Sequence, residues 1–137
     1  MSKGTSRIHV IKVFDTVEIA ASGTAYNDTL DGAILGLPGT QYPAIDLNLI
    51  QCEGYGSLHL VLTGDGTLQV DAVYSPLNDG STTFVIPEGV SALATDLTAG
   101  QCCIPLTELK LGKFLKLLLT ETGGASTITV TGWLTLQ

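Results

Sequence analysis

The residues that could carry out chemistry are few and far apart in the chain. Both histidines, His9 and His59, lie inside segments with a strand pattern. The three cysteines, Cys52, Cys102 and Cys103, could join a histidine as zinc ligands, but no C-x-x-C or H-x-x-x-H spacing accompanies them. We therefore expect free thiols in or near a core and no metal site.

The motifs of nucleophilic catalysis and nucleotide binding are incomplete as well. Ser57 follows two glycines, but His59 stands where a nucleophile elbow needs its second glycine. The sequence contains neither a G-x-G-x-x-G string nor a P-loop. With thirteen Asp and Glu residues, carboxylate pairs arise by chance, so a glycosidase pair has little support. We predict a protein that is not an enzyme and has no catalytic residue, cofactor or metal ion.

The distribution of charge favours docking onto a partner. Six basic and thirteen acidic residues give a formal net charge of −7. No Lys or Arg lies between Val13 and Leu109, and an acidic body of this kind repels nucleic acid. The basic residues form one group near each end of the sequence: Lys3, Arg7 and Lys12, then Lys110, Lys113 and Lys116. Such groups could orient docking, although the same pattern suits a protein that charge merely keeps soluble.

The sequence also bears on localisation. The opening five residues are polar, and no apolar run follows that could serve as a signal peptide. The longest apolar stretch, around residues 117–119, is far shorter than the roughly 20 residues that a membrane-spanning helix needs. We expect a protein made in the cytoplasm that has no contact with a membrane, and an odd number of cysteines fits that compartment.

The elements that position these residues are predicted to be short strands. Only 14% of the residues are charged, and Thr, Ser and Gly, which suit pleated strands and tight turns, replace them. Period-2 alternation predicts strands with one face on a core at residues 45–49, 58–63, 68–74 and 128–136. The apolar run at residues 8–14 predicts a strand buried on both faces, and a further strand is favoured over a helix at residues 113–120. The Asp65-Gly66 pair predicts a hairpin between its flanking strands.

These patterns add up to one all-β domain. We expect about nine or ten short strands and at most one short helix, at residues 90–97, where apolar residues have helical spacing. Many short strands with regular turn signals are typical of a β-sandwich or barrel. The sequence therefore predicts a flexible N-terminal arm at residues 1–7 and a single antiparallel β-sandwich, jelly-roll-like, at residues 8–137.

Trp133 lies on the polar side of the last predicted strand. The opposite side carries the apolar residues Ile128, Val130, Gly132, Leu134 and Leu136, whereas Trp133 alternates with threonines. Either a second layer covers this ring or it belongs to a contact surface, where Trp is over-represented. The predicted partner-contacting residues are Trp133 and four basic residues, Lys3, Arg7, Lys110 and Lys113.

Several short strings follow one another in a characteristic order from residue 57 onward. They are SLHLVLTG (57–64), LQVDAVYS (68–75), NDG (78–80), LTAGQ (97–101), GKFLKLLLT (112–120) and TITVTGWL (127–134). In pattern and order this part resembles the small β-sandwich cement, or decoration, proteins of tailed bacteriophage capsids. Similar strings occur in phage tail and fibre modules, and members often carry Arg where this chain has Lys113 to Leu117.

The resemblance implies a virion structural protein. Cement proteins bind the major capsid protein on the outside of an assembled head, commonly as homotrimers, and strengthen the capsid against internal pressure. The protein would then be made in the host cytoplasm and end on the capsid exterior. The alternative is a carbohydrate-binding or adhesion module, which the sandwich pattern and the loop tyrosines Tyr26, Tyr42 and Tyr55 also suit, since aromatic rings stack on sugars.

Overall fold

The structure, a computed structural model, describes residues 9–27, 30–31, 41–42, 45–46, 56–77, 83–106 and 114–136. All regular secondary structure in these ranges is β-strand. The strands are β1 (His9–Ile19), β2 (Thr24–Tyr26), β3 (Leu30–Asp31), β4 (Gln41–Tyr42), β5 (Ile45–Asp46), β6 (Gly56–Gly64), β7 (Leu68–Ser75), β8 (Ala94–Leu97), β9 (Gly100–Leu106), β10 (Phe114–Glu121) and β11 (Ile128–Leu136). The predicted arm at residues 1–7 lies outside the described residues.

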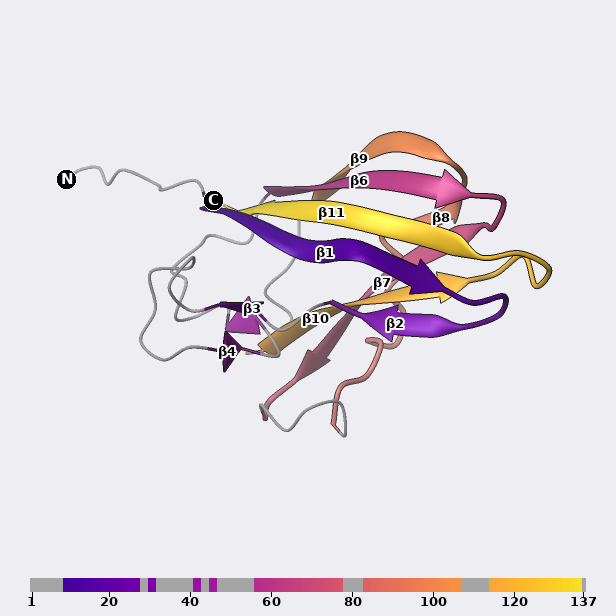
Figure 1. The fold of residues 1–137 in the computed structure, drawn as a ribbon. Coiled ribbons are helices and arrows are strands. Elements are labelled where there is room, and N and C mark those ends of the chain that lie inside the picture. Colours follow the sequence, from indigo (N-terminus) through magenta and orange to yellow (C-terminus); the bar gives the residue numbers. More distant parts are fainter. Residues whose placement is uncertain are drawn as a thin grey trace.

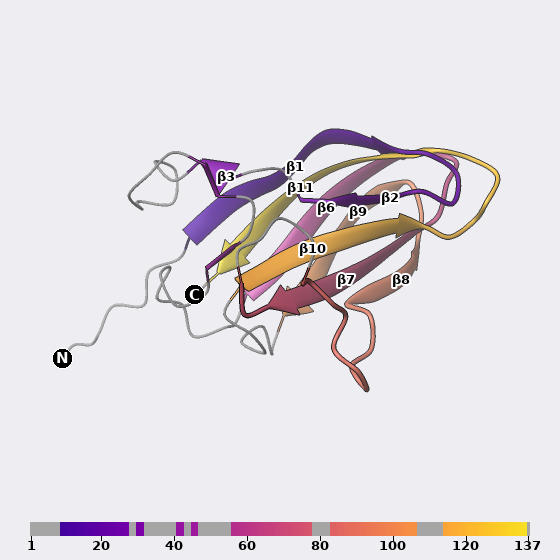
Figure 2. The ribbon, with the colours of Figure 1, turned by 90° about the horizontal axis from the view of Figure 1, so that it is seen from below.

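Eight of these strands form two antiparallel sheets packed face to face (Figure 1). The first sheet has the order β1-β11-β6-β9, and the second has the order β2-β10-β7-β8, with β5 beside the start of β10. The connections β1–β2, β6–β7, β8–β9 and β10–β11 each cross from one sheet to the other, as Figure 2 shows from below. This strand order is that of a jelly roll, so the predicted all-β jelly-roll sandwich is confirmed.

Two local predictions are wrong because the sequence does not reveal which of the two sheets each strand joins. The turn around Asp65 exists, but β6 pairs with β11 and β9 while β7 pairs with β10 and β8. The turn therefore joins two sheets and closes no hairpin. The segment predicted as a possible helix contains β8, which pairs with β7 at Leu68 and Val70. Leu93, Ala94 and Leu97, whose spacing suggested a helix, instead pack against the core from β8 and the residue before it.

The prediction of a strand buried on both faces at residues 8–14 is also wrong. Val10 and Lys12 are exposed, whereas Val13 and Phe14 are both fully buried. The reason is a shift of register between Lys12 and Phe14 in the pairing of β1 with β11. Such a bulge adds a residue to one strand, so two neighbouring side chains point into the same core.

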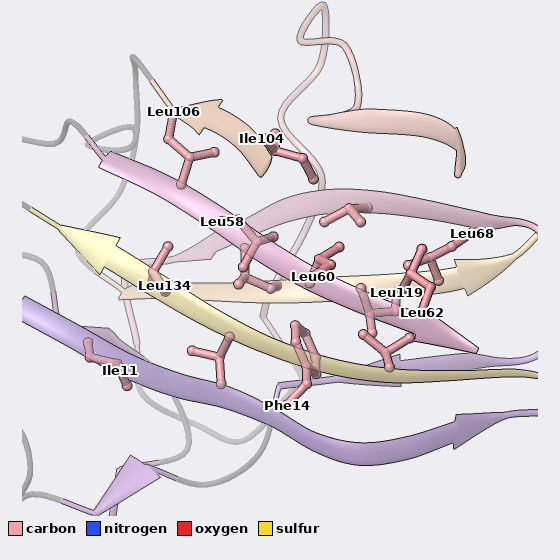
Figure 3. Close-up of a cluster of buried hydrophobic side chains, with 14 of the residues drawn as sticks. Ile11, Phe14, Leu58, Leu60, Leu62, Leu68, Ile104, Leu106, Leu119 and Leu134 are labelled. Carbon is pink, nitrogen blue, oxygen red and sulfur yellow. The ribbon is translucent and has the colours of Figure 1, made fainter. Parts of the chain in front are cut away.

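Gly132 gives the core room for a large aromatic ring. It pairs with Phe14 in the register of β1 and β11, and Phe14 and Leu60 point between the sheets (Figure 3). A Cβ at Gly132 would lie 2.6 Å from Leu60 Cδ2 and 3.3 Å from Phe14 Cδ2. Gly132 therefore occupies the inward position of β11 at which side chains from the two neighbouring strands, β1 and β6, already fill the core.

We expect Gly132→Val to lower the free energy of unfolding by about 1–3 kcal/mol, because its methyl groups overpack the space beside Phe14. Thr129→Val, on the outward row of the same strand, should change it by no more than about 0.5 kcal/mol. Chemical denaturation of both variants tests this. Equal stability of the two variants would contradict the tight fit at Gly132.

The carboxylate of Glu121 ties together three connections at one end of the sandwich. The side chain is only 1% exposed, and its Oε1 accepts hydrogen bonds from the backbone N–H groups of Ser22 (3.0 Å) and Gly124 (2.7 Å). Its Oε2 accepts hydrogen bonds from those of Thr67 and Gly123, both at 2.8 Å. These donors come from the β1–β2, β6–β7 and β10–β11 connections. The hydrogen bonds, that from Thr67 foremost, lower the pKa of Glu121 from 4.5 to about 2.

This lowered pKa predicts an acid-dependent loss of stability. Because the folded state holds the carboxylate ionised, its contribution is fully present above pH 4.5 and is lost as the pH falls toward about 2. Glu121→Gln should be less stable at neutral pH, since its NH₂ group faces backbone donors, and should lack this acid-dependent component. Thermal unfolding between pH 7 and pH 2 measures both effects. The exposed Glu18→Gln is the control and should follow the wild type at every pH.

Candidate docking face on the first sheet

The two sheets differ in what lies over their outer faces. On the second sheet, Phe84 is buried against Val73, with Tyr26, Phe114 and Leu118 packed beside them. The β7–β8 connection, which carries Phe84, therefore covers part of that face. Over the outer face of the first sheet, by contrast, no described segment passes in Figure 1. The first sheet thus offers the broad free surface of the described part of the chain.

Four side chains from four strands form a row across the middle of this free surface. Trp133 on β11 pairs in register with Lys12 on β1 and with His59 on β6, and His59 pairs with Cys103 on β9. The ring centroids of Trp133 and His59 are 6.2 Å apart at an interplanar angle of 60°, and Lys12 Nζ lies 5.7 Å from the Trp133 ring. We call this surface, which the row from Lys12 through Trp133 and His59 to Cys103 crosses from edge to edge, the Trp133 face.

The residues around the row are small and uncharged. Along β11, Thr131 and Thr135 flank Trp133, and along β6, Ser57 and Val61 flank His59, all four half-buried. The charged residues of this surface, Lys12, Asp15 and Glu18, all lie on β1 at one edge of the sheet. Lys12 and Asp15 form an ion pair of 3.1 Å. A central Trp with charge confined to the rim is the composition of a protein–protein interface.

The chemistry that this face can perform is limited by its geometry. Within the described residues no hydrogen bond joins His59 to Cys103, so this pair lacks the contact that an activated nucleophile needs. The same part of the chain has no group of three or more His, Cys, Asp or Glu residues placed to hold a metal ion. Cys103 is exposed, whereas Cys102 packs against the core and burial raises the pKa of its thiol.

The structure places the predicted site residues unevenly. Trp133 lies half-buried at the centre of the face. Lys3, Arg7, Lys110 and Lys113 fall outside the described residues. Lys116, from the second basic group, is buried on the second sheet, with its Nζ 5.2 Å from the Tyr26 ring and 4.9 Å from the Phe84 ring. It therefore packs on aromatic rings and adds little to a basic surface.

The sequence names His59 and Cys103 only as zinc-ligand candidates and Lys12 only as part of a basic group, so it places none of the three beside Trp133. His59, Cys103 and Lys12 each lie on the outward side of a strand, as Trp133 does, but they are far apart in sequence. Only the pairing register of β1, β11, β6 and β9 brings them together. Alternation alone reports the face on which each residue lies and gives no information about its neighbours across the sheet.

Comparisons with known proteins leave the family of this chain open. No protein-family model and no curated protein sequence matches it. Solved structures with a similar shape include the VP2 subviral particle of infectious bursal disease virus, at a TM-score of 0.47 and 19% identity over 95% of this chain and 32% of that one. Others are the periplasmic g-type lysozyme inhibitor PliG of Aeromonas hydrophila (TM-score 0.42, 12% identity, 100% and 91% covered) and the xylan-binding module CBM86 of Roseburia intestinalis (0.36, 11%, 98% and 97%). This chain spans about a third of the length of the virus protein, and similarities this weak carry no argument about function.

The described residues contain no helix with the length and hydropathy needed to cross a membrane. Because the similar structures carry no argument about function, the candidate surface is interpreted from its own side chains.

The contrast between Cys102 and Cys103 predicts two classes of thiol. In a Cys52→Ser chain, Cys103 should react with a disulfide reagent in a fast phase, and Cys102 should follow more slowly because its thiol is partly buried and its pKa is raised. Cys103→Ser should remove only the fast phase, and Cys102→Ser only the slow one. A single phase for both thiols would contradict the difference in exposure between Cys102 and Cys103.

Proposed function

We propose that this protein is a non-enzymatic cement protein of a phage capsid, which docks on the major capsid protein through the Trp133 face. The observation that carries the proposal is the position of Trp133. The largest aromatic side chain of the protein lies at the centre of a sheet face that is uncharged in its middle and that no described segment covers. Trp in such a setting is the residue most often found to dominate binding energy.

The resemblance of residues 57–134 to cement proteins supplies the kind of partner. The confirmed jelly roll suits such a role, because this architecture recurs in viral capsid domains. The net charge of −7 is compatible with the capsid exterior, where the protein does not touch packaged DNA. In this proposal the protein is made in the host cytoplasm, assembles as a homotrimer on the capsid surface, and needs no cofactor.

A carbohydrate-binding role is the competing proposal, and the same ring motivates it. A half-buried Trp beside a His on a jelly-roll face offers a stacking surface for a sugar as well as for a protein. The rest of the face separates the two possibilities. The acids of this face, Asp15 and Glu18, lie on β1 at its edge, and Asp15 is engaged in the ion pair with Lys12. Of the two threonines that flank the ring, Thr131 already uses its hydroxyl to accept a hydrogen bond from the Thr16 N–H at 3.1 Å, which leaves it less able to bind a sugar hydroxyl.

Trp133→Ala tests the docking face directly. Removing a central aromatic anchor typically costs at least about 2 kcal/mol of binding, so we expect its affinity for capsids to fall by roughly 30-fold or more. The measurement uses capsids assembled from the major capsid protein encoded with this chain. Binding is read by co-sedimentation, and capsid stability by the temperature at which the capsids disassemble.

Trp133→Phe is the matched control, because it keeps a ring on the face and should retain most of the binding. Circular dichroism of both variants checks that the sandwich is intact. Wild-type protein that neither binds nor stabilises such capsids sinks the cement proposal. A glycan-array signal that disappears in Trp133→Ala would establish the carbohydrate role in its place.

A further inference from the structure

His59 lies where any contact through the middle of the Trp133 face would include it. It is half-buried on β6, one of the two inner strands of the first sheet. Its ring centroid is 6.2 Å from that of Trp133 at an interplanar angle of 60°, and Cys103 is its partner in register on the other side. A protein partner that covers Trp133 with a contact of ordinary size, about 800 Å² on each side, therefore buries the imidazole of His59 as well.

The described residues around His59 offer no counter-charge to its ring. Those that flank it on β6, or that pair with these positions on β11 and β9, are Ser57, Val61, Thr131, Trp133, Thr135, Gln101, Cys103 and Pro105. None of these side chains is charged, and the thiol of Cys103 is the one titratable group among them. The charged residues of the first sheet all lie on β1, where Glu18 is exposed and Lys12 and Asp15 form an ion pair of 3.1 Å.

The charge state of His59 therefore decides what it costs to bury this side chain. Histidine is the side chain whose charge ordinarily changes between about pH 5 and pH 8. Water solvates an imidazolium on the free face, but a contact that excludes water leaves the cation buried without a counter-charge, which is costly. A neutral imidazole packs against the Trp133 ring without that cost. Docking is then favourable chiefly for the neutral form of His59.

The same side chains indicate the chemistry of the partner. A basic group placed over Trp133 would approach Lys12, whose Nζ already lies 5.7 Å from the centroid of that ring. A carboxylate placed there would have Lys12 as the only permanent cation of the described sheet, and Lys12 lies at the β1 edge and is engaged with Asp15. The complementary surface is therefore one without charge at its centre, as in the core of most protein–protein contacts.

We propose that the Trp133 face docks on an uncharged, apolar patch of its partner, and that it does so only while His59 is neutral. This role rests on the docking function proposed above and adds to it the chemistry of the partner and a dependence on pH. Because the docked protein binds fewer protons than the free one, proton linkage requires the affinity to fall as the pH is lowered. A single proton limits the loss to about tenfold for each pH unit below the titration midpoint of His59 in the free protein.

The experiment measures binding to capsids of the same major capsid protein, by co-sedimentation, at intervals from about pH 8 to about pH 5.5. Wild type should lose affinity as the pH falls, beginning at the midpoint that NMR of the His59 ring protons gives for the free protein. His59→Gln, which keeps a neutral polar group, should bind with an affinity that does not change at that midpoint. His59→Lys, which makes the charge permanent, should bind at least about tenfold more weakly than His59→Gln at about pH 8.

Two matched controls separate His59 from the other titratable groups. His9→Gln, at the start of β1, replaces the other histidine of the chain and should keep the wild-type dependence on pH. Cys103→Ser replaces the neighbouring thiol and should keep it as well. Circular dichroism checks that each variant retains the sandwich. If His59→Gln loses its β-sheet signal, His59→Thr, which suits a strand, replaces it.

Several results would overturn the role of His59. They are a wild-type affinity that stays constant or rises as the pH falls, a His59→Gln variant that loses affinity as wild type does, a His59→Lys variant that binds as tightly as His59→Gln, and a dependence on pH that disappears in either control. A rise in affinity would mean that the partner places a carboxylate against His59. Trp133→Ala, measured at about pH 8 alone, tests the docking function separately. Binding that survives in Trp133→Ala overturns docking through this face and the role of His59 with it, whereas binding that is lost there but shows no change due to His59 overturns only the latter.

Discussion

The carboxylate of Glu121 is the contact on which the order of this jelly roll depends. Each crossing between the sheets leaves backbone N–H groups that no strand can pair, and three of these crossings meet at one end of the sandwich. The Glu121 side chain, which is almost completely buried, accepts hydrogen bonds from four of those N–H groups at 2.7 to 3.0 Å. These hydrogen bonds are partly buried, and a backbone donor shielded from water without a partner is costly, so one carboxylate satisfies donors from three connections. The strands whose ends it fixes include β11, β6 and β1, which carry Trp133, His59 and Lys12.

Much of the fold was predictable because alternation and composition report burial directly. The inward and outward rows of β11 follow the sequence residue by residue, and the same is true of Leu58, Leu60 and Leu62 on β6. The failures share one physical cause. Asp65-Gly66 predicts a turn correctly but cannot tell whether the strands on either side pair with each other or enter different sheets. The bulge that turns both Val13 and Phe14 inward depends on β11, which lies more than a hundred residues later.

Of the residues in the candidate site, only Trp133 could be predicted from the sequence as part of a contact surface. Trp133 could be identified because a large apolar residue stood among threonines on the polar side of a strand. His59 and Cys103 lack a comparable signal, since each is an ordinary outward residue until the register of four strands aligns them. Lys116 shows the opposite error. The sequence groups it with Lys110 and Lys113 as basic residues that could orient docking, but in the structure its stem is buried and its ammonium group lies over two aromatic rings.

The proposed homotrimer would change what each docking face has to contribute. The Trp133 face belongs to the outer side of the first sheet, and each copy of it offers one aromatic anchor. Once one copy of such a trimer is bound, the other copies face the lattice at a high effective concentration, so weak individual contacts yield tight binding. In that arrangement a single Trp per chain is sufficient to hold the protein on its partner.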